Sequence, residues 1–171
     1  PVALIHALAE IANGYGCGRD MHIGDTIIGI KGRVGFEAAA PLIIIKAHHM
    51  LEKHTLVKEQ LYWKELIANY YGQLMHEAQY LNPVMRDMEK FLESTQSSVN
   101  GTVDVLLRPY NFFVLGCTSE YDLMSSKFGE YGEMNKSYTG RDVVGFTKVL
   151  SNPLKIYYSL HEDEKEKASK N

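Results

Sequence analysis

Glycine is concentrated in one short stretch of the chain, and this stretch limits what the chain can fold into. Seven of the 14 glycines lie between residues 14 and 35, mixed with β-branched residues. Because glycine tolerates positive φ angles and close backbone approach, such a stretch favours short strands and tight turns over helix. We predict strands at 20–23 and 26–31, preceded by a helix at 2–13 that ends at Gly14.

Three consecutive helices are expected after the glycine-rich stretch. Pro41 suits the first turn of a helix over residues 42–53. Thr55 can cap a second helix, and Asn82 followed by Pro83 starts a third. Apolar and aromatic residues recur at helical spacing in both the second and the third helix. We expect those of the third helix to face inward and those of the second to pack in the core or at an interface. They are Trp63, Ile67, Tyr70 and Leu74 in the second helix, and Val84, Met88 and Phe91 in the third.

A β-hairpin and C-terminal helices complete the expected elements. Alternating apolar residues predict a strand over 102–108, and a turn at 109–111 leads to a returning strand over 112–117. The Thr139–Asp142 segment resembles a capping box that begins a helix, and Asn152-Pro153 predicts a last short helix. The fold class is therefore α+β, with glycine-rich β segments and a hairpin on either side of three helices.

The composition argues against several classes of partner. The net charge is −3 and the 18 lysines and arginines are scattered, whereas a nucleic-acid-binding protein usually carries a basic face. No apolar run approaches the roughly 20 residues of a membrane span, and no signal peptide is visible. Only two cysteines occur, far apart, which favours a reduced, cytoplasmic setting over a structural zinc site. We expect neither nucleic-acid nor membrane partners.

The residues taken alone offer no catalytic constellation. The Gly14–Gly18 segment is interpreted as a structural turn, because no Gly-Lys-Ser/Thr follows it and no helix begins there. His48 and Glu52 share a helix face, but a metal site needs three or four convergent ligands. A structural role is therefore favoured for the histidines, the cysteine and the helical aromatic residues: His48, His49, His54, Cys17, Trp63, Tyr70 and Tyr71.

The glycine-rich stretch resembles a segment of argininosuccinate synthases. The family's pattern there is close to GVGRxDxVENRxxGxKSRGxYExP, followed by a helix with an Ala-His pair. This chain matches the pattern without gaps at Gly16, Gly18, Arg19, Gly29, Lys31, Arg33, Glu37 and Ala47-His48. The segments Gly101–Val105, Ser119–Leu123 and Gly145-Phe146 also follow in family order, so the resemblance covers essentially the whole chain.

The resemblance implies an ATP-dependent ligase of arginine biosynthesis, which joins citrulline to aspartate and releases AMP and pyrophosphate. In the family, a glycine-rich SGGxDTS loop in an N-terminal domain binds ATP with its Mg²⁺, and the enzyme is a homotetramer. This sequence contains no such loop, so the N-terminal ATP-binding domain is absent from it. We expect this chain alone to bind no ATP and to form no argininosuccinate. Residues 1–160 correspond to the C-terminal portion of the synthetase domain, and 161–171 to a charged tail.

Two departures from the family pattern concern the citrulline site. The family's glutamate in VENR and its tyrosine in YExP align with Gly24 and Phe36, so both substrate-contacting side chains are changed. Arg33 and Glu37 match the family, and we expect them to support the pocket wall. The substitutions predict either an N-acylated citrulline as substrate or a replacement glutamate elsewhere. The alternative to a functional synthetase is a non-catalytic structural or oligomerisation module.

Overall fold

The chain forms two compact units, and each is described by itself. The computed structural model describes residues 1–125, 127, 129 and 136–168, and the units are Pro1–Leu123 and Met124–Asn171. The first unit contains α1 (Val2–Asn13), β1 (Arg19–Gly24), β2 (Gly32–Glu37), α2 (Ala39–Thr55), α3 (Lys58–His76), α4 (Pro83–Thr95), the 3₁₀ helix η1 (Gln96–Ser98), β3 (Thr102–Arg108) and β4 (Asn111–Thr118). The second contains α5 (Gly140–Ala168). The predicted α+β class is confirmed.

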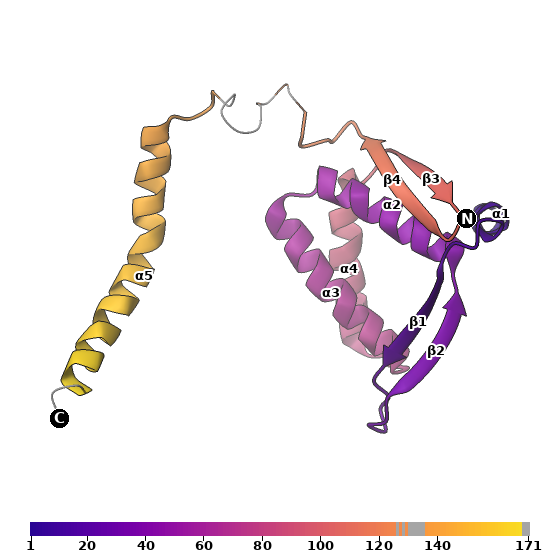
Figure 1. Cartoon of the computed structure of the whole chain (residues 1–171), viewed down its shortest axis with the longest axis horizontal. Helices are drawn as coiled ribbons and strands as arrows, with labels where there is room; N and C mark the ends of the chain where they lie inside the picture. Colours follow the sequence, from indigo (N-terminus) through magenta and orange to yellow (C-terminus); the bar gives the residue numbers. More distant parts are fainter. Residues whose placement is uncertain (126, 128, 130–135, 169–171) are drawn as a thin grey trace. The chain divides into compact units, whose positions relative to one another are not determined.

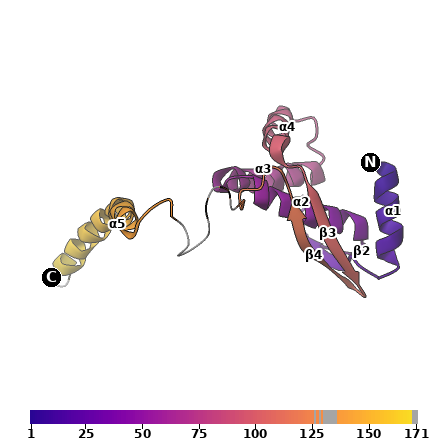
Figure 2. The same cartoon turned by 90° about the horizontal axis from the view of Figure 1, so that it is seen from above.

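Two separate antiparallel strand pairs, β1–β2 and β3–β4, make up the β structure of the described residues. Figure 1 shows the β1–β2 hairpin projecting from the N-terminal end of α2. Helices α3 and α4 pack against each other. Helix α2 packs against α1 and against both β3 and β4, and Figure 2 shows this arrangement from above. Helix α2 is therefore the central element of the first unit, and the hairpin leads directly into it.

The first core cluster joins α1, α2 and the β3–β4 hairpin. Its buried residues are Ala12, Cys17, Ala39 and Ile43, with Leu8, Val105, Leu107 and Phe112 packed against them. The thiol of Cys17 lies 3.2 Å from the backbone oxygen of Asn111, so this cysteine is a buried packing residue, as expected.

Gly18 allows the glycine-rich turn to pass close to α2. Its φ is +75°, and an added Cβ would lie 2.6 Å from the Cα of Ala39. A side chain fits neither this backbone conformation nor this space, so glycine is required here for packing. The geometry agrees with the interpretation of the 14–18 segment as a structural turn.

The second core cluster joins α3 to α4. Leu74, Met85 and Met88 are buried, and Ile67 and Tyr71 pack against them. Two members of the expected stripe on α3 lie outside this cluster, since Trp63 and Tyr70 are 55% and 52% exposed. The helix turns its Ile67, Tyr71 and Leu74 side toward α4, so the inward stripe is narrower than the apolar pattern indicates.

Helix starts were predicted well in one case and poorly in another. Asn82 caps α4 as predicted, since its side-chain oxygen accepts a 3.2 Å hydrogen bond from the backbone N–H of Val84. Thr55 caps nothing: it is the last residue of α2, and its hydroxyl donates a 2.9 Å hydrogen bond to the Leu51 carbonyl. Helix α3 begins at Lys58 instead.

The strand expected at 26–31 is wrong. Residues 25–31 form the turn of the first hairpin, and the second strand is β2, Gly32–Glu37. The Thr26 hydroxyl donates a 2.6 Å hydrogen bond to the Ile30 carbonyl, and Gly29 has a φ of +84°. These local turn interactions outweigh the strand preference of the β-branched isoleucines in this segment.

Helix α5 is continuous, which corrects the break expected at Asn152-Pro153. Its start was predicted correctly, because the Asp142 carboxylate accepts a 2.8 Å hydrogen bond from the backbone N–H of Thr139. Pro153 lies inside the helix, where it removes one backbone donor without ending the helix. Most of the tail expected from 161 is also helical, to Ala168, and 169–171 lie outside the described residues. None of the described helices is long and apolar enough to cross a membrane.

Candidate functional site

The β1–β2 hairpin separates the four residues that the family resemblance assigned to the citrulline site. The pairing is regular, with Asp20 opposite Phe36, His22 opposite Val34, and Gly24 opposite Gly32. Directly opposed residues share a face and successive residues alternate between faces. One face therefore contains both substituted positions, Gly24 and Phe36, and we call it the Gly24 face. Its members are Asp20, His22, Gly24, Gly32, Val34 and Phe36.

The space beside Gly24 is occupied by a histidine. A Cβ added at Gly24 would lie 2.5 Å from Nε2 of His22 and 3.2 Å from its Cδ2. His22 precedes Gly24 by two residues on β1, so both lie on the same face of the hairpin. At the position where the family has a glutamate side chain, this chain therefore presents an imidazole edge.

The rest of the Gly24 face is mainly apolar. Phe36 is half-buried, and Val34 is 58% exposed opposite His22. Asp20 carries the one carboxylate on this face, and its Oδ1 accepts a 2.7 Å hydrogen bond from the backbone N–H of Met21. A ligand on this face would meet one imidazole, one carboxylate and an apolar wall.

Arg33 and Glu37 lie on the opposite face of the hairpin. Arg33 is opposite Ile23, and Glu37 is opposite Arg19, out of phase with Gly24 and Phe36. The Glu37 carboxylate accepts a 3.2 Å hydrogen bond from Nε of Arg19, and both side chains are substantially exposed. An exposed pair of this kind contributes about 0–1 kcal/mol. Arg33 and Glu37 therefore do not belong to the Gly24 face.

A pocket lies at the base of the hairpin. Its volume is about 460 Å³, and it is lined by Asn13, Gly14, Tyr15, Gly16, Arg19, Pro109 and Tyr110. The backbone N–H of Tyr110 donates a 2.7 Å hydrogen bond to the Tyr15 carbonyl, which joins the glycine-rich turn to the β3–β4 turn. The glycines of this turn thus serve packing between two chain segments.

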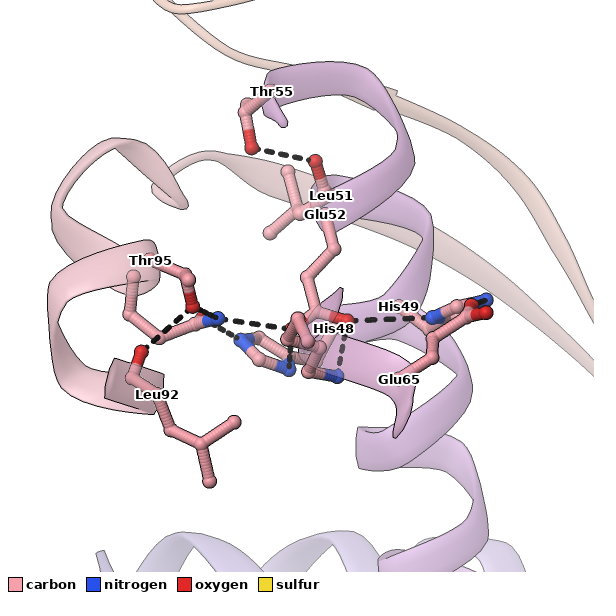
Figure 3. Close-up of polar contacts among 10 residues, drawn as sticks. His48, His49, Leu51, Glu52, Thr55, Glu65, Leu92 and Thr95 are labelled. Atoms are coloured by element: carbon pink, nitrogen blue, oxygen red, sulfur yellow. Dashed lines mark hydrogen bonds and ion pairs between the residues drawn. The ribbon is translucent and has the colours of Figure 1, made fainter. Parts of the chain in front are cut away.

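A second polar cluster surrounds the buried carboxylate of Glu52 on α2. Figure 3 shows His48 and His49 close to Glu52, and Glu65 beside His49. Glu52 has no exposed surface, and it accepts hydrogen bonds from Nζ of Lys64 at 2.7 Å and from Nε2 of Gln96 at 3.0 Å. His48 and Glu52 share a helix face as expected, with 3.7 Å between Nδ1 of His48 and Oε1 of Glu52.

The charge of Glu52 is stabilised by its partners. Burial alone would raise the pKa of its carboxyl, but the hydrogen bond and positive charge of Lys64, the hydrogen bond from Gln96 and the charge of His48 lower it. The net pKa lies below its ordinary value, so Glu52 is ionised at neutral pH. The cluster ties α2 to α3 and to η1, and the structural role expected for His48 and His49 is confirmed.

The third histidine joins α2 to the segment after β4. Nδ1 of His54 lies 3.1 Å from Oδ1 of Asp122, and the backbone N–H of Leu123 donates a 2.8 Å hydrogen bond to the His54 carbonyl. His54 is thus also a satisfied structural residue. Within the described parts of the chain, no group of three or more His, Cys, Asp or Glu side chains could bind a metal ion.

Two features of these sites were missed from the sequence. His22 was not singled out, although it lies on the predicted 20–23 strand two residues before Gly24, and a strand extended by one residue places the two on one face. Lys64 and Gln96 were not linked to Glu52, because they are 12 and 44 residues away in the sequence. Only the first omission had a local signal that could have revealed it.

Comparison with known proteins identifies the family. The family model for the arginosuccinate synthase C-terminal domain matches residues 1–157. An argininosuccinate synthase of Dictyoglomus turgidum is 34% identical over 149 residues, which cover 87% of this chain and 37% of the relative. One of Halalkalibacterium halodurans is 34% identical over 167 residues, which cover 98% of this chain and 41% of the relative. The chain spans about two fifths of the length of these relatives. It therefore belongs to the argininosuccinate synthase family and matches the C-terminal domain of that family.

Proposed function

We propose that this chain is part of an AMP-forming ligase that joins a citrulline-type substrate to aspartate. The overall reaction would consume ATP and release AMP, pyrophosphate and an argininosuccinate product, as a step of arginine biosynthesis. The family membership of residues 1–157 supports this class of reaction. Both cysteines, Cys17 and Cys117, are free thiols, which suits a cytoplasmic enzyme.

The nucleotide and its metal ion do not fit the described residues of this chain. The 14–18 turn lacks the Gly-Lys-Ser/Thr sequence of a phosphate loop, and no described cluster of three metal-ligand side chains exists. Mg²⁺ would supply charge neutralisation at the phosphates. We therefore propose that ATP and Mg²⁺ bind to the part of the enzyme that corresponds to the other three fifths of the relatives. Titration of ATP and Mg²⁺ into residues 1–171 should show no saturable micromolar binding; such binding would contradict this division.

The Gly24 face supports a proposal about the substrate class. A glutamate at position 24 could pair with the α-ammonium group of citrulline, whereas Gly24 offers no charge. Burying an ammonium group without a partner costs several kcal/mol. Acylation turns the ammonium into a neutral amide and adds bulk, while glycine removes a charge and opens space. Phe36 makes the same face less polar. We therefore propose an N-acylated citrulline, rather than free citrulline, as the substrate.

Pyrophosphate release by the full-length enzyme tests both proposals. With ATP, aspartate and either N-acetylcitrulline or N-succinylcitrulline, we expect one pyrophosphate and one AMP per product formed. A full-length enzyme that releases no pyrophosphate with citrulline or with either acyl derivative would contradict the ligase assignment and favour the non-catalytic alternative. A higher kcat/KM for free citrulline than for both derivatives would contradict only the acyl assignment.

Exposed apolar and aromatic side chains support assembly as a second property of the protein. Trp63 and Tyr62 form an edge-to-face pair on α3, with ring centroids 5.7 Å apart, and both are more than half exposed. Helix α5 also exposes many apolar side chains, among them Val143, Phe146, Val149, Leu150, Leu154 and Tyr157. Surfaces of this kind commonly form interfaces. We propose self-association through these helices, with a homotetramer as the assembled state.

A further inference from the structure

We propose that His22 selects the N-acylated substrate by donating a hydrogen bond from its imidazole to the acyl carbonyl oxygen. This inference rests on the proposed function, because it assigns a residue to the substrate class suggested for the Gly24 face. His22 thus becomes a specificity-determining residue at a position that the family pattern leaves variable.

The location of His22 supports this role. Nε2 of His22 lies 2.5 Å from the position of a Cβ added at residue 24. The imidazole therefore occupies the space where a side chain at position 24 would begin. His22 also lies between the two substituted positions along the face, since it is opposite Val34, and Gly24 and Phe36 lie to either side. A group that replaces the ammonium near residue 24 would therefore meet the imidazole first.

The imidazole is free to act. His22 is exposed, and the hydrogen bonds and ion pairs found among the described residues do not include its side chain. An exposed imidazole with no structural partner contrasts with His48, His49 and His54, each of which has a polar partner. A neutral imidazole with its proton on Nε2 can donate a hydrogen bond to a carbonyl oxygen.

The charges around His22 favour the amide carbonyl over a more distant acidic group of the substrate. The Gly24 face carries no lysine or arginine, because Arg19 and Arg33 lie on the other face. Lys31, at the end of the hairpin turn, is paired with Asp25. A carboxylate on the acyl group would find no guanidinium or ammonium partner on this face. The shared feature of acetyl and succinyl derivatives, the amide carbonyl, is therefore the group assigned to His22.

Variants of the full-length enzyme test the assignment. His22→Leu removes the donor and keeps a similar volume, whereas His22→Gln places an amide N–H near the position of Nε2. Met21→Leu is the matched control, because Met21 is the neighbouring residue on the opposite face of β1. For each variant, kcat and KM are measured with N-acetylcitrulline, N-succinylcitrulline and free citrulline, and folding is checked by circular dichroism.

The expected result is a change in substrate preference rather than a general loss. His22→Leu should lower kcat/KM for both acyl substrates about tenfold, mainly through KM, as the loss of one hydrogen bond predicts. The kcat/KM of His22→Leu for free citrulline should stay unchanged. His22→Gln should keep most of the preference for acyl substrates, and Met21→Leu should keep all of it.

Three results would overturn the role of His22. An equal loss for all three substrates would show a structural role, and no loss for any would show no role. A loss confined to N-succinylcitrulline would assign His22 to the terminal carboxylate instead. A preference of the unmodified enzyme for free citrulline is a different outcome: it would overturn the proposed substrate class before any variant is made.

Discussion

Lys64 donates a 2.7 Å hydrogen bond to Glu52, a carboxylate with no exposed surface, and so connects α3 to α2. Because the partners of Glu52 lower its pKa below the ordinary value of 4.5, its contribution to stability depends on pH in a defined direction. A carboxyl whose pKa is lowered in the folded state stabilises the fold fully above its unfolded pKa. That contribution is lost as the pH falls through the folded pKa.

The first prediction is that Glu52→Gln destabilises the protein by about 3 kcal/mol at pH 7, because it leaves the Lys64 ammonium without its carboxylate. The difference in the free energy of unfolding between the variant and the wild type should become smaller as the pH falls below 4.5. Thermal unfolding followed by circular dichroism from pH 7 to pH 3 measures this. Glu65→Gln is the control: Glu65 is 47% exposed and pairs with His49, so little change is expected. A pH-independent effect of Glu52→Gln would contradict the account.

The second prediction concerns the core between α3 and α4. Met85 is fully buried in this cluster, and Met85→Ala should lower the free energy of unfolding by about 2–5 kcal/mol, because the lost side chain leaves a cavity. Leu81→Ala is the matched control, since Leu81 is 90% exposed in the connection before α4. Urea unfolding of both variants measures the difference. Equal midpoints for the two variants would show that the α3–α4 cluster is not a core.

The third prediction tests the close approach at Gly18. Gly18→Ala should destabilise the protein by more than about 1 kcal/mol, because the φ of +75° and the backbone of Ala39 at 2.6 Å both oppose a Cβ. Gly35→Ala should change stability little, since nothing lies within 4 Å of a Cβ at that position. Thermal unfolding compares the two exchanges, and a similar small shift for both would contradict the packing assigned to the turn.

The fourth prediction concerns self-association. Trp63→Ser should lower the average mass of the assembled protein at a given concentration, because it removes a large exposed aromatic side chain from α3. Lys58→Ala, on the same helix, should leave the mass unchanged. Light scattering over a concentration series measures the mass. A protein that is monomeric at high concentration without any substitution would show that the exposed helical surfaces form no interface.

The sequence predicted a helix start correctly where the capping residue and the backbone group that it binds lie within a few residues of each other. Asn82 with Pro83 and Thr139 with Asp142 each satisfy backbone donors at a helix start, and both starts were predicted correctly. Thr55 failed because its hydroxyl has a competing partner in its own helix, the Leu51 carbonyl.

Longer-range packing explains the remaining differences from the predicted fold. The exposed side chains of Trp63 and Tyr70 follow from which side of α3 meets α4, which the apolar pattern alone does not determine. Helix α5 continues through Pro153, although proline lacks one backbone donor and usually ends or kinks a helix. The isoleucines of the first hairpin turn favour a strand because they are β-branched, but the hydrogen bond from Thr26 holds this segment in a turn.

The candidate site was only partly predictable. Gly24 and Phe36 were identified through the family pattern, and not through any property of the residues themselves. The sequence analysis did not place Arg33 and Glu37 on the other face, because it put the second strand at 26–31 and expected none over 32–37. Because the turn was predicted in the wrong place, the sequence analysis did not show that His22 and Phe36 lie on the same face of the hairpin.

The ratio of kcat/KM for N-acetylcitrulline to kcat/KM for free citrulline tests most directly whether the Gly24 face accepts an N-acylated citrulline. The full-length enzyme and its Gly24→Glu variant are compared by pyrophosphate release. A glutamate can be placed at position 24 when the flexible imidazole of His22 moves aside, since only His22 atoms lie near the added Cβ. We predict a ratio above one for the unmodified enzyme, lowered at least about tenfold by Gly24→Glu. A ratio below one for the unmodified enzyme, or a ratio unchanged by Gly24→Glu, would contradict the claim.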